Sequence, residues 1–420
     1  MNNIPFSART NAVACSKNRY CVLIGALLLV STACASASSS PGVTAQPSAA
    51  VPAREAGDVV SVKDFGARGD NAANDAGAIQ SAIDSLGPRG GKVYLPKGRY
   101  LIGTTGLSIV NNSTQLMGDG GDFDDTSATD APTLIRYTGK GAAITIGSAG
   151  MTAVLHGIVI RDLEVRGTRD GASGIRFKYN PARSTFVGRS LIENVSVKGF
   201  SGANGAGIEF EFGVSNTLRR TNTAENLNGI RIAGGTAYLF TNILSRGNSG
   251  HGIYINFVNG LLLDGMSVLE SNDGPGLFLA GIDNSRNVYI RHTHFEDNNL
   301  VNGSANYQLY VTGRGAARIA NLVIDGVEFA SSGFPSQGGD MFLDFLGSSH
   351  VDHIWSNRTA ATPVLKYGST IALSRYGRQI IKGEKATIDA DGRALTDVLP
   401  VPASIPNRRS PPTRETRPGK

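Results

Sequence analysis

Short runs of strictly alternating apolar and polar residues recur along the middle of the chain, most of them opening at a glycine. Alternation of this kind is typical of a strand that buries one face. The first apolar residues of successive runs are 22 to 33 residues apart. The runs are SGIRFKY (173–179), AGIEFEF (206–212), NGIRIAG (228–234), HGIYINF (251–257), PGLFLAG (275–281), YQLYVTG (307–313) and DMFLDFL (340–346).

A second recurring unit lies between these runs. It consists of two short alternating strands separated by two residues, often Asn, Asp or Gly, as in GIVIRDLEVRG (157–167) and SLIENVSVKG (190–199). Each period therefore holds three short strands and at least one tight turn. A self-similar period of this length predicts a solenoid, and three strands per turn predict an all-β fold, a right-handed, single-stranded parallel β-helix.

The first coil of a solenoid needs a cap, because its core and its strand edge would otherwise meet water. The segment NDAGAIQSAIDSLGPRGG predicts a capping helix, since Asn74 or Asp75 can act as the N-cap and a Gly-Pro pair follows. The apolar stripe of this helix is Ile79, Ile83 and Leu86.

The same region carries a family resemblance. VSVKDFGARGDNAANDAGAIQSAID (60–84), followed by GGKVYLPKGRYLI (90–102), resembles the N-terminal module of the pectate-lyase-superfamily β-helix proteins. That superfamily includes rhamnogalacturonase-like and polygalacturonase-like enzymes and phage tailspike-type depolymerases. The chain departs from it at Asn74-Asp75-Ala76, where the family commonly has Asp-Asp-Thr. The resemblance implies a polysaccharide groove on one strand face and leaves the reaction open.

Alternation also predicts which side chains of the glycine-led runs point out of the coil. Phe210 and Phe212 should fill the core, and neighbouring coils should lie about 4.8 Å apart. Arg and Lys can hold carboxylates, and exposed aromatic faces can stack on sugar rings. An ordinary ladder of opposite charges is the alternative for the charged positions. The predicted substrate-binding residues are Arg176, Lys178, Tyr254, Asn256, Phe278 and Tyr310.

The outward positions also hold the candidates for catalysis. Glu209 and Glu211 would have Cα atoms about 6.6 Å apart on one face, and inverting glycosidases hold their carboxyl groups about 6.5–9.5 Å apart. For β-elimination, in which a proton is taken from the carbon next to a uronate carboxylate, the candidate bases are Arg231, Lys178, His251 and Tyr254, with Arg176 neutralising charge. His251 stands in a Gly-His-Gly that resembles the polygalacturonase motif, although the family's aspartates are missing.

These residues predict a carbohydrate-active enzyme that cleaves an extracellular, acidic polysaccharide as a lyase or a glycoside hydrolase. The alternative is a non-catalytic surface β-helix protein that binds glycan or scaffolds an envelope assembly. The partner in both cases is a polysaccharide, and the oligomeric state is left open.

Two segments of the sequence resemble metal motifs, and the first does not predict a metal site. His292, His294 and Glu296 are close in sequence, but only His294 and Glu296 share an outward face, and two ligands do not make a zinc site. GDGGDFDDTSATD (118–130) holds five aspartates without the spacing of a calcium-binding helix–loop–helix. Calcium is a candidate ligand there, and no other cofactor is predicted.

The N-terminus predicts export. CVLIGALLLV (21–30) is an apolar core behind basic residues, so residues 1–37 are expected to be a signal peptide. One processing alternative resembles a lipobox and would lipidate Cys34, the only predicted membrane contact; the other is ordinary cleavage after Ala35-Ser36-Ala37. The protein is expected to be secreted, periplasmic or an outer-membrane lipoprotein.

Composition sets the remaining boundaries. Residues 38–56 predict a flexible linker, 57–400 the β-helix with its cap, and 401–420 a disordered basic tail. Of the net charge of +6, +3 lies in residues 1–37 and +4 in residues 401–420, which leaves −1 for the rest. A nearly neutral fold argues against a nucleic-acid-binding domain.

Overall fold

The computed structural model describes residues 59–123, 131–299, 307–313, 317–331, 339–344, 346, 349–357, 364–367, 381–382 and 388–389. All of them lie in one compact unit, Arg54–Lys420. The expected signal peptide, linker and basic tail lie outside the described residues, and the domain boundaries stay predictions. No helix in the described ranges is long and apolar enough to cross a membrane.

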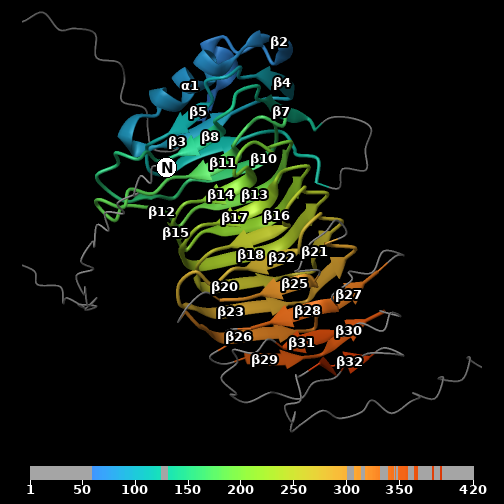
Figure 1. Cartoon of the computed structure of the whole chain (residues 1–420). Helices are drawn as coiled ribbons and strands as arrows, with labels where there is room; N and C mark the ends of the chain where they lie inside the picture. Colours follow the sequence, from blue (N-terminus) through green and yellow to red (C-terminus); the bar gives the residue numbers. More distant parts are fainter. Residues whose placement is uncertain are drawn as a thin grey trace, which may run out of the picture. The chain divides into compact units, whose positions relative to one another are not determined.

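Two parallel sheets make up the coils, which follow one another from the N-terminal to the C-terminal end (Figure 1). The first has eleven strands, one per coil, and is called sheet B here. Its strands are β5 (Leu107–Ile109), β8 (Ala142–Ile146), β11 (Ser173–Phe177), β14 (Ala206–Phe210), β17 (Asn228–Ile232), β19 (Ile253–Ile255), β22 (Leu277–Leu279), β25 (Tyr307–Val311), β28 (Gly339–Leu343), β31 (Leu365–Tyr367) and β33 (Ile388–Asp389).

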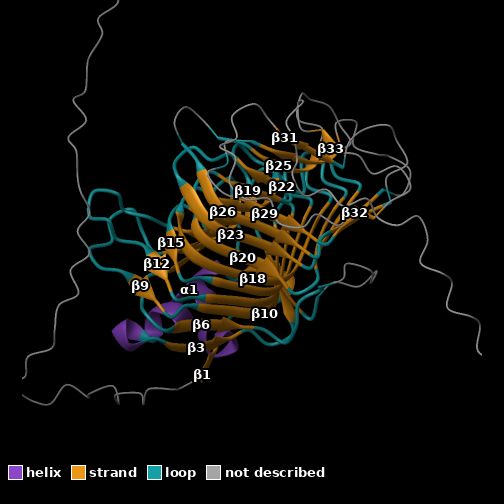
Figure 2. Cartoon of the chain, turned by 90° about the horizontal axis from the view of Figure 1, so that it is seen from below, coloured by secondary structure: helices purple, strands orange, loops and turns teal. Residues whose placement is uncertain are grey.

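The second sheet has twenty-two strands and wraps the rest of each coil (Figure 2). Its strands are β1 (Val59–Ser61), β2 (Asp70–Asn74), β3 (Gly91–Tyr94), β4 (Gly98–Leu101), β6 (Thr114–Met117), β7 (Thr133–Arg136), β9 (Leu155–His156), β10 (Val159–Arg166), β12 (Val187–Gly188), β13 (Leu191–Lys198), β15 (Gly213–Val214), β16 (Thr217–Ala224), β18 (Gly235–Arg246), β20 (Asn259–Asp264), β21 (Ser267–Glu270), β23 (Ser285–Arg291), β24 (Thr293–Glu296), β26 (Ile319–Asp325), β27 (Glu328–Ala330), β29 (Ser349–Asp352), β30 (Ile354–Ser356) and β32 (Ile381–Lys382).

The core of the coil stack is built from side chains in parallel register. On sheet B the inward positions pair coil by coil and are fully buried. Each buried aliphatic side chain contributes about 1.5–3 kcal/mol. These positions are Ile144, Ile175, Ile208, Ile230, Ile253, Leu277, Leu309, Met341 and Leu365. The predicted all-β parallel β-helix is confirmed.

One bend of the second sheet lies inside the long strands β10, β13, β16 and β18, at a residue with left-handed backbone, which is Arg220 in β16. Asp162, Asn194 and Asn242 occupy this bend with φ of 58°, 52° and 53°. Asn and Asp tolerate this conformation better than other residues that carry a side chain. The Asn and Asp between paired short strands in the sequence therefore mark the bends.

The predicted cap is a helix, α1 (Ala76–Ser85), at the N-terminal end of the stack (Figure 1). Its residues Ile79 and Ile83 are buried in the core. Short 3₁₀ turns, η1 (Val62–Phe65) and η2 (Gly87–Arg89), flank this region. The Asp75 carboxylate does not cap α1, because it accepts hydrogen bonds from the backbone N–H groups of Arg68 (2.6 Å) and Gly69 (2.9 Å) instead.

A ladder of buried asparagines joins the turns that precede sheet B. The Asn248 Oδ1 accepts from the backbone N–H of Asn226 (3.0 Å), and its Nδ2 donates to Oδ1 of Asn272 (2.7 Å). Asn272 repeats the pattern by donating to Oδ1 of Asn298 (2.7 Å). The ladder satisfies turn groups that are removed from water and would otherwise lack partners.

Replacing Asn248 with alanine should lower the free energy of unfolding by about 2 kcal/mol or more, because it leaves buried donors and acceptors unpaired on two coils. The measurement is urea-induced unfolding followed by far-ultraviolet circular dichroism. Asn259→Ala is the matched control, since this half-buried Asn has no side-chain hydrogen bond among the described residues. Equal losses of unfolding free energy in both variants would contradict a stabilising role of the asparagine ladder.

Candidate functional site

The outward positions of sheet B form one continuous row across the coils, called the outer ladder here. Its members are in direct register from β5 to β28, with one residue contributed by each strand. The outer ladder consists of Ser108, Thr145, Arg176, Glu209, Arg231, Tyr254, Phe278, Tyr310 and Phe342. It is polar at one end, charged in the middle and aromatic at the other end.

Glu209 points out of the coil and is nevertheless buried, with a side-chain exposure of 6%. One carboxylate oxygen accepts from the Nε of Arg176 (2.7 Å) and from the hydroxyl of Ser173 (2.6 Å). The other oxygen accepts from Nη1 of Arg231 (2.6 Å). Glu209 therefore lies between two arginines, one on each neighbouring coil.

Glu211 follows the end of β14 and is held in a similar way. Its carboxylate forms an ion pair with the ammonium group of Lys178 and accepts a hydrogen bond from the backbone N–H of Tyr179 (3.1 Å). The expectation that Phe212 fills the core is wrong, because β14 ends at Phe210. Phe212 is half-buried and stacks on Tyr179, with ring centroids 5.0 Å apart.

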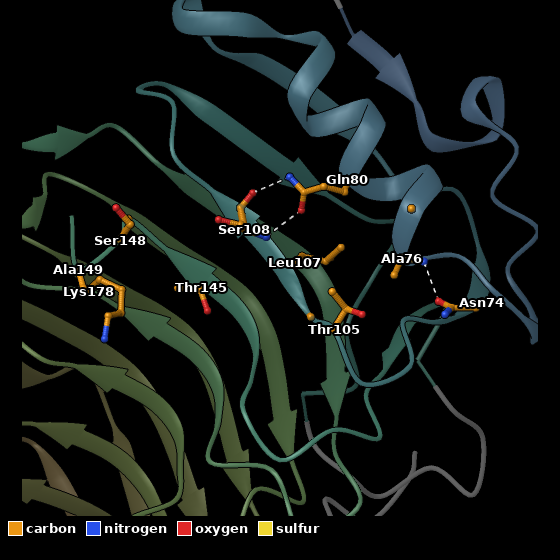
Figure 3. Close-up of a pocket in the computed structure, with 13 residues that line it drawn as sticks. Asn74, Ala76, Gln80, Thr105, Leu107, Ser108, Thr145, Ser148, Ala149 and Lys178 are labelled. Atoms are coloured by element: carbon orange, nitrogen blue, oxygen red, sulfur yellow. Dashed lines mark hydrogen bonds between the residues drawn. The ribbon is translucent and has the colours of Figure 1, made fainter. Parts of the chain in front are cut away.

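A cavity of about 720 Å³ opens at the polar end of the outer ladder. Thr145 and Ser108 line it from sheet B, Gln80 lines it from α1, and Lys178 lines it from the next coil (Figure 3). The Gln80 side chain ties α1 to β5 through paired hydrogen bonds with the backbone of Ser108 (2.9 and 3.0 Å). This cavity therefore adjoins the charged middle of the ladder.

The aromatic end of the ladder is a stack of rings. Phe278 and Tyr310 stack with ring centroids 5.3 Å apart, and Tyr310 and Phe342 with centroids 4.8 Å apart. Tyr254 lies 5.4 Å from Phe278 at an angle of 31°. Because these rings cover one another along the stack, most ring faces are occupied by neighbouring rings. The stacking of sugars on these rings stays a prediction.

His251 lies beside the start of the aromatic end. Its ring stacks on Phe278 at 5.1 Å and packs obliquely against Tyr254 at 5.0 Å. Its Nδ1 is 2.9 Å from Oδ1 of Asn228. Burial lowers the pKa of His251 to about 4. The imidazole is therefore neutral at pH 7.

The two arginines keep capacity for a further anion. Arg231 and Arg176 reach Glu209 through single nitrogens, and Arg176 also donates to Ser173 through Nη2 (2.9 Å). A guanidinium has five N–H donors, so both groups retain donors beyond these bonds. Two arginines against one carboxylate leave a net charge of +1 on this cluster.

Asn256 lies on the same strand face and has a buried Oδ1 without a hydrogen-bond donor. Sequence analysis did not identify two residues that hydrogen-bond within the site, Ser173 and Asn228. Each stands at the first position of a sheet B strand, and each is buried. A polar residue at a buried strand start is the signal that could have identified them.

The candidate metal motifs remain without support as a metal site. The described residues contain no group of three or more His, Cys, Asp or Glu side chains that could hold a metal ion. In the acidic segment, Asp119 accepts from the Tyr94 hydroxyl (2.6 Å), and Asp122 pairs with Lys198 (3.2 Å). Residues 124–130 lie outside the described ranges, so calcium binding stays an untested prediction.

A family comparison identifies the fold lineage. The model of the rhamnogalacturonase A/epimerase, pectate lyase-like family matches residues 59–277, slightly more than half of the chain. The chain belongs to this family. The matched range covers the strands of sheet B from β5 to β19 and ends at the first residue of β22. It therefore contains the charged part of the outer ladder.

Curated relatives match shorter stretches. Mannuronan C5-epimerase AlgE1 of Azotobacter vinelandii is 44% identical over 68 residues, which is 15% of this chain and 5% of that protein. Alginate lyase 7 of the same organism is 41% identical over 66 residues, which is 14% of this chain and 8% of that protein. The chain thus matches only a small part of these relatives.

A solved structure supports the fold. The enzymatically active domain of tailspike protein 2 from bacteriophage CBA120 has a TM-score of 0.52 to this chain and is 14% identical. The alignment covers 79% of this chain and 47% of that chain. Similarity at this level of identity shows a shared pectate lyase-like β-helix.

Substituting Glu209 with glutamine should destabilise the protein by about 3 kcal/mol, because the buried carboxylate, which is 6% exposed, is the charged partner of two guanidinium groups. Glu211→Gln is the control and should cost about 1 kcal/mol or less, since the Lys178–Glu211 pair is 22% and 26% exposed. Chemical denaturation of both variants measures the difference. A smaller loss for Glu209→Gln than for Glu211→Gln would contradict the assigned burial.

Proposed function

We propose that this protein is a carbohydrate-active enzyme that acts on an acidic polysaccharide laid along the outer ladder of sheet B. The observation that carries the proposal is the order of groups along the outer ladder. Arg231, a member of the cationic Arg176–Glu209–Arg231 cluster, pairs in register with Tyr254, and the His251 ring packs against Tyr254 at 5.0 Å. The cluster offers donors for a sugar carboxylate, and the imidazole offers a base. Arg and carboxylate groups form strong charge-assisted hydrogen bonds.

The chemistry that fits is removal of the proton on the carbon next to a uronate carboxylate. Arg231 binds the carboxylate and stabilises the negative charge that develops on it. The C–H bond breaks, the proton passes to Nε2 of His251, and the electron pair enters the carboxylate as an enolate. In elimination the bond to the neighbouring sugar oxygen then breaks and that oxygen takes a proton from water. In epimerisation a proton from water returns to the carbon on its other face.

Hydrolysis by a Glu209–Glu211 pair is less well supported. A general acid must face the leaving sugar oxygen with a carboxyl oxygen that no other group engages. Glu209 is engaged on both oxygens by Ser173 and the two arginines. These contacts suit a residue that holds Arg231 in place.

The relatives support an acidic substrate. Their names describe a mannuronan epimerase and an alginate lyase, and both polymers consist of uronic acids. Both reactions begin with loss of the same proton. Export to a compartment that contains such polymers agrees with the predicted signal peptide, with lipidation at Cys34 as the alternative anchor.

A non-catalytic glycan-binding role is the second candidate. It is favoured by the mutual pairing of Arg176, Arg231, Lys178, Glu209 and Glu211, which would stabilise the coils even without a substrate. Binding of a polyuronate without turnover would select this role.

The purified protein should convert at least one member of a panel of polyuronates. Elimination is measured as ultraviolet absorbance of the unsaturated sugar, and epimerisation as deuterium uptake at the carbon next to the carboxylate in D₂O. His251→Ala should lower the rate by about 10²- to 10⁴-fold, the usual contribution of a general base.

His156→Ala is the control for this variant, because His156 is exposed on β9 in the second sheet. It should retain full activity. New reducing ends without unsaturation would support hydrolysis instead, and an unimpaired His251→Ala enzyme would remove His251 as the base.

A further inference from the structure

We infer that Asn228 is a positioning residue that fixes the tautomer of His251, so that Nε2 is the basic nitrogen presented at the outer ladder. This inference deepens the proposed function and rests on it for its catalytic meaning. The geometry rests on contacts among Gly205, Asn228 and His251. Gly205 directly precedes β14, Asn228 begins β17, and His251 lies shortly before β19.

The orientation of the Asn228 amide is determined by its other contact. Its Nδ2 donates to the backbone carbonyl of Gly205 at 3.1 Å, and a carbonyl can only accept. The amide oxygen must therefore face the opposite way, toward His251. The backbone N–H of His251 points to the same oxygen at 3.4 Å, in agreement with this orientation.

This orientation determines the proton on the imidazole. The Asn228 Oδ1 lies 2.9 Å from Nδ1 of His251, and an amide oxygen cannot donate. Nδ1 must therefore carry the hydrogen of the neutral ring. No residue in the described part of the chain hydrogen-bonds to Nε2, and this nitrogen is absent from the buried, unsatisfied atoms. Its lone pair remains available.

The surroundings of the ring oppose protonation. The ring contacts Asn228, Tyr254 and Phe278 and lies close to Gly274, and of these four residues only Tyr254 can ionise. Burial is the single cause that lowers the pKa of His251 to about 4. An amide accepts the Nδ1 hydrogen without adding a negative charge, whereas a carboxylate at this position would favour the imidazolium.

One consequence is that activity should persist at pH values well below 6.5, where an ordinary histidine becomes protonated. The base stays deprotonated as the pH falls from 6.5, and it is lost only as the pH passes through about 4. The folded state prefers neutral His251, so the stability it contributes is present above the unfolded pKa and disappears over this same window.

The test is nitrogen NMR of the protein labelled with ¹⁵N-histidine, in wild type and in Asn228→Asp and Asn228→Ala. Wild-type His251 should show a hydrogen on Nδ1 and a pKa well below 6.5. Asn228→Asp should keep that tautomer and raise the pKa by about one to three pH units. Asn228→Ala should keep the low pKa and show a mixture of both tautomers.

Activity follows the same pattern if the proposed function is correct. The acid limb of the rate profile should move to higher pH in Asn228→Asp. Asn228→Ala should lower kcat with little change in KM. Asn259→Ala, outside the site, should match the wild type in both spectra and rates.

The outcomes separate the two proposals. A hydrogen on Nε2 in the wild type, or an unchanged His251 pKa in Asn228→Asp, would overturn the inference whatever the activity. A locked Nδ1–H tautomer in a protein that turns over no polyuronate would support the positioning role and refute the catalytic function. If Asn228→Asp does not fold, the wild-type spectrum and Asn228→Ala decide the matter.

Discussion

In the inner strands of sheet B, paired residues have a partner one coil before and another one coil after, at the same position along the strand. This parallel register is the constraint on which the rest of the structure depends. It places like beside like inside, where Ile175, Ile208 and Ile230 stack. It also forces outward neighbours to be compatible, because a charged residue cannot move away from the residue next to it on the adjoining coil.

The charged part of the outer ladder solves this problem by alternation. An arginine, a glutamate and an arginine occupy consecutive coils, so each contact joins opposite charges. The Ser173 hydroxyl adds a neutral donor to the buried carboxylate of Glu209. The resulting Arg176–Glu209–Arg231 cluster is rigid, has a net positive charge and retains guanidinium N–H groups that can bind a further anion. Rigidity of this kind lets a site stabilise developing charge without rearranging.

The sequence predicts the period, the inward and outward positions, and the order of residues along the ladder, because these follow from alternation and glycine spacing. It fails where a strand ends: alternation alone continues past Phe210, whereas Glu211 and Phe212 belong to the turn that follows. It also cannot predict how rings lie against one another, as Phe278 and Tyr310 do. Lateral contacts such as Asn228 with His251 depend on loops of unequal length that set which residues meet.

One consequence concerns how such a protein can change over time. The left-handed bends at Asp162, Asn194 and Asn242 lie at the same place in β10, β13 and β18, and Arg220 holds this place in β16. A single inserted residue between bend and strand would turn all later side chains of that coil inside out. Two kinds of change preserve the register: exchange of outward side chains at constant length, and growth of the loops that leave the coil, such as residues 178–186.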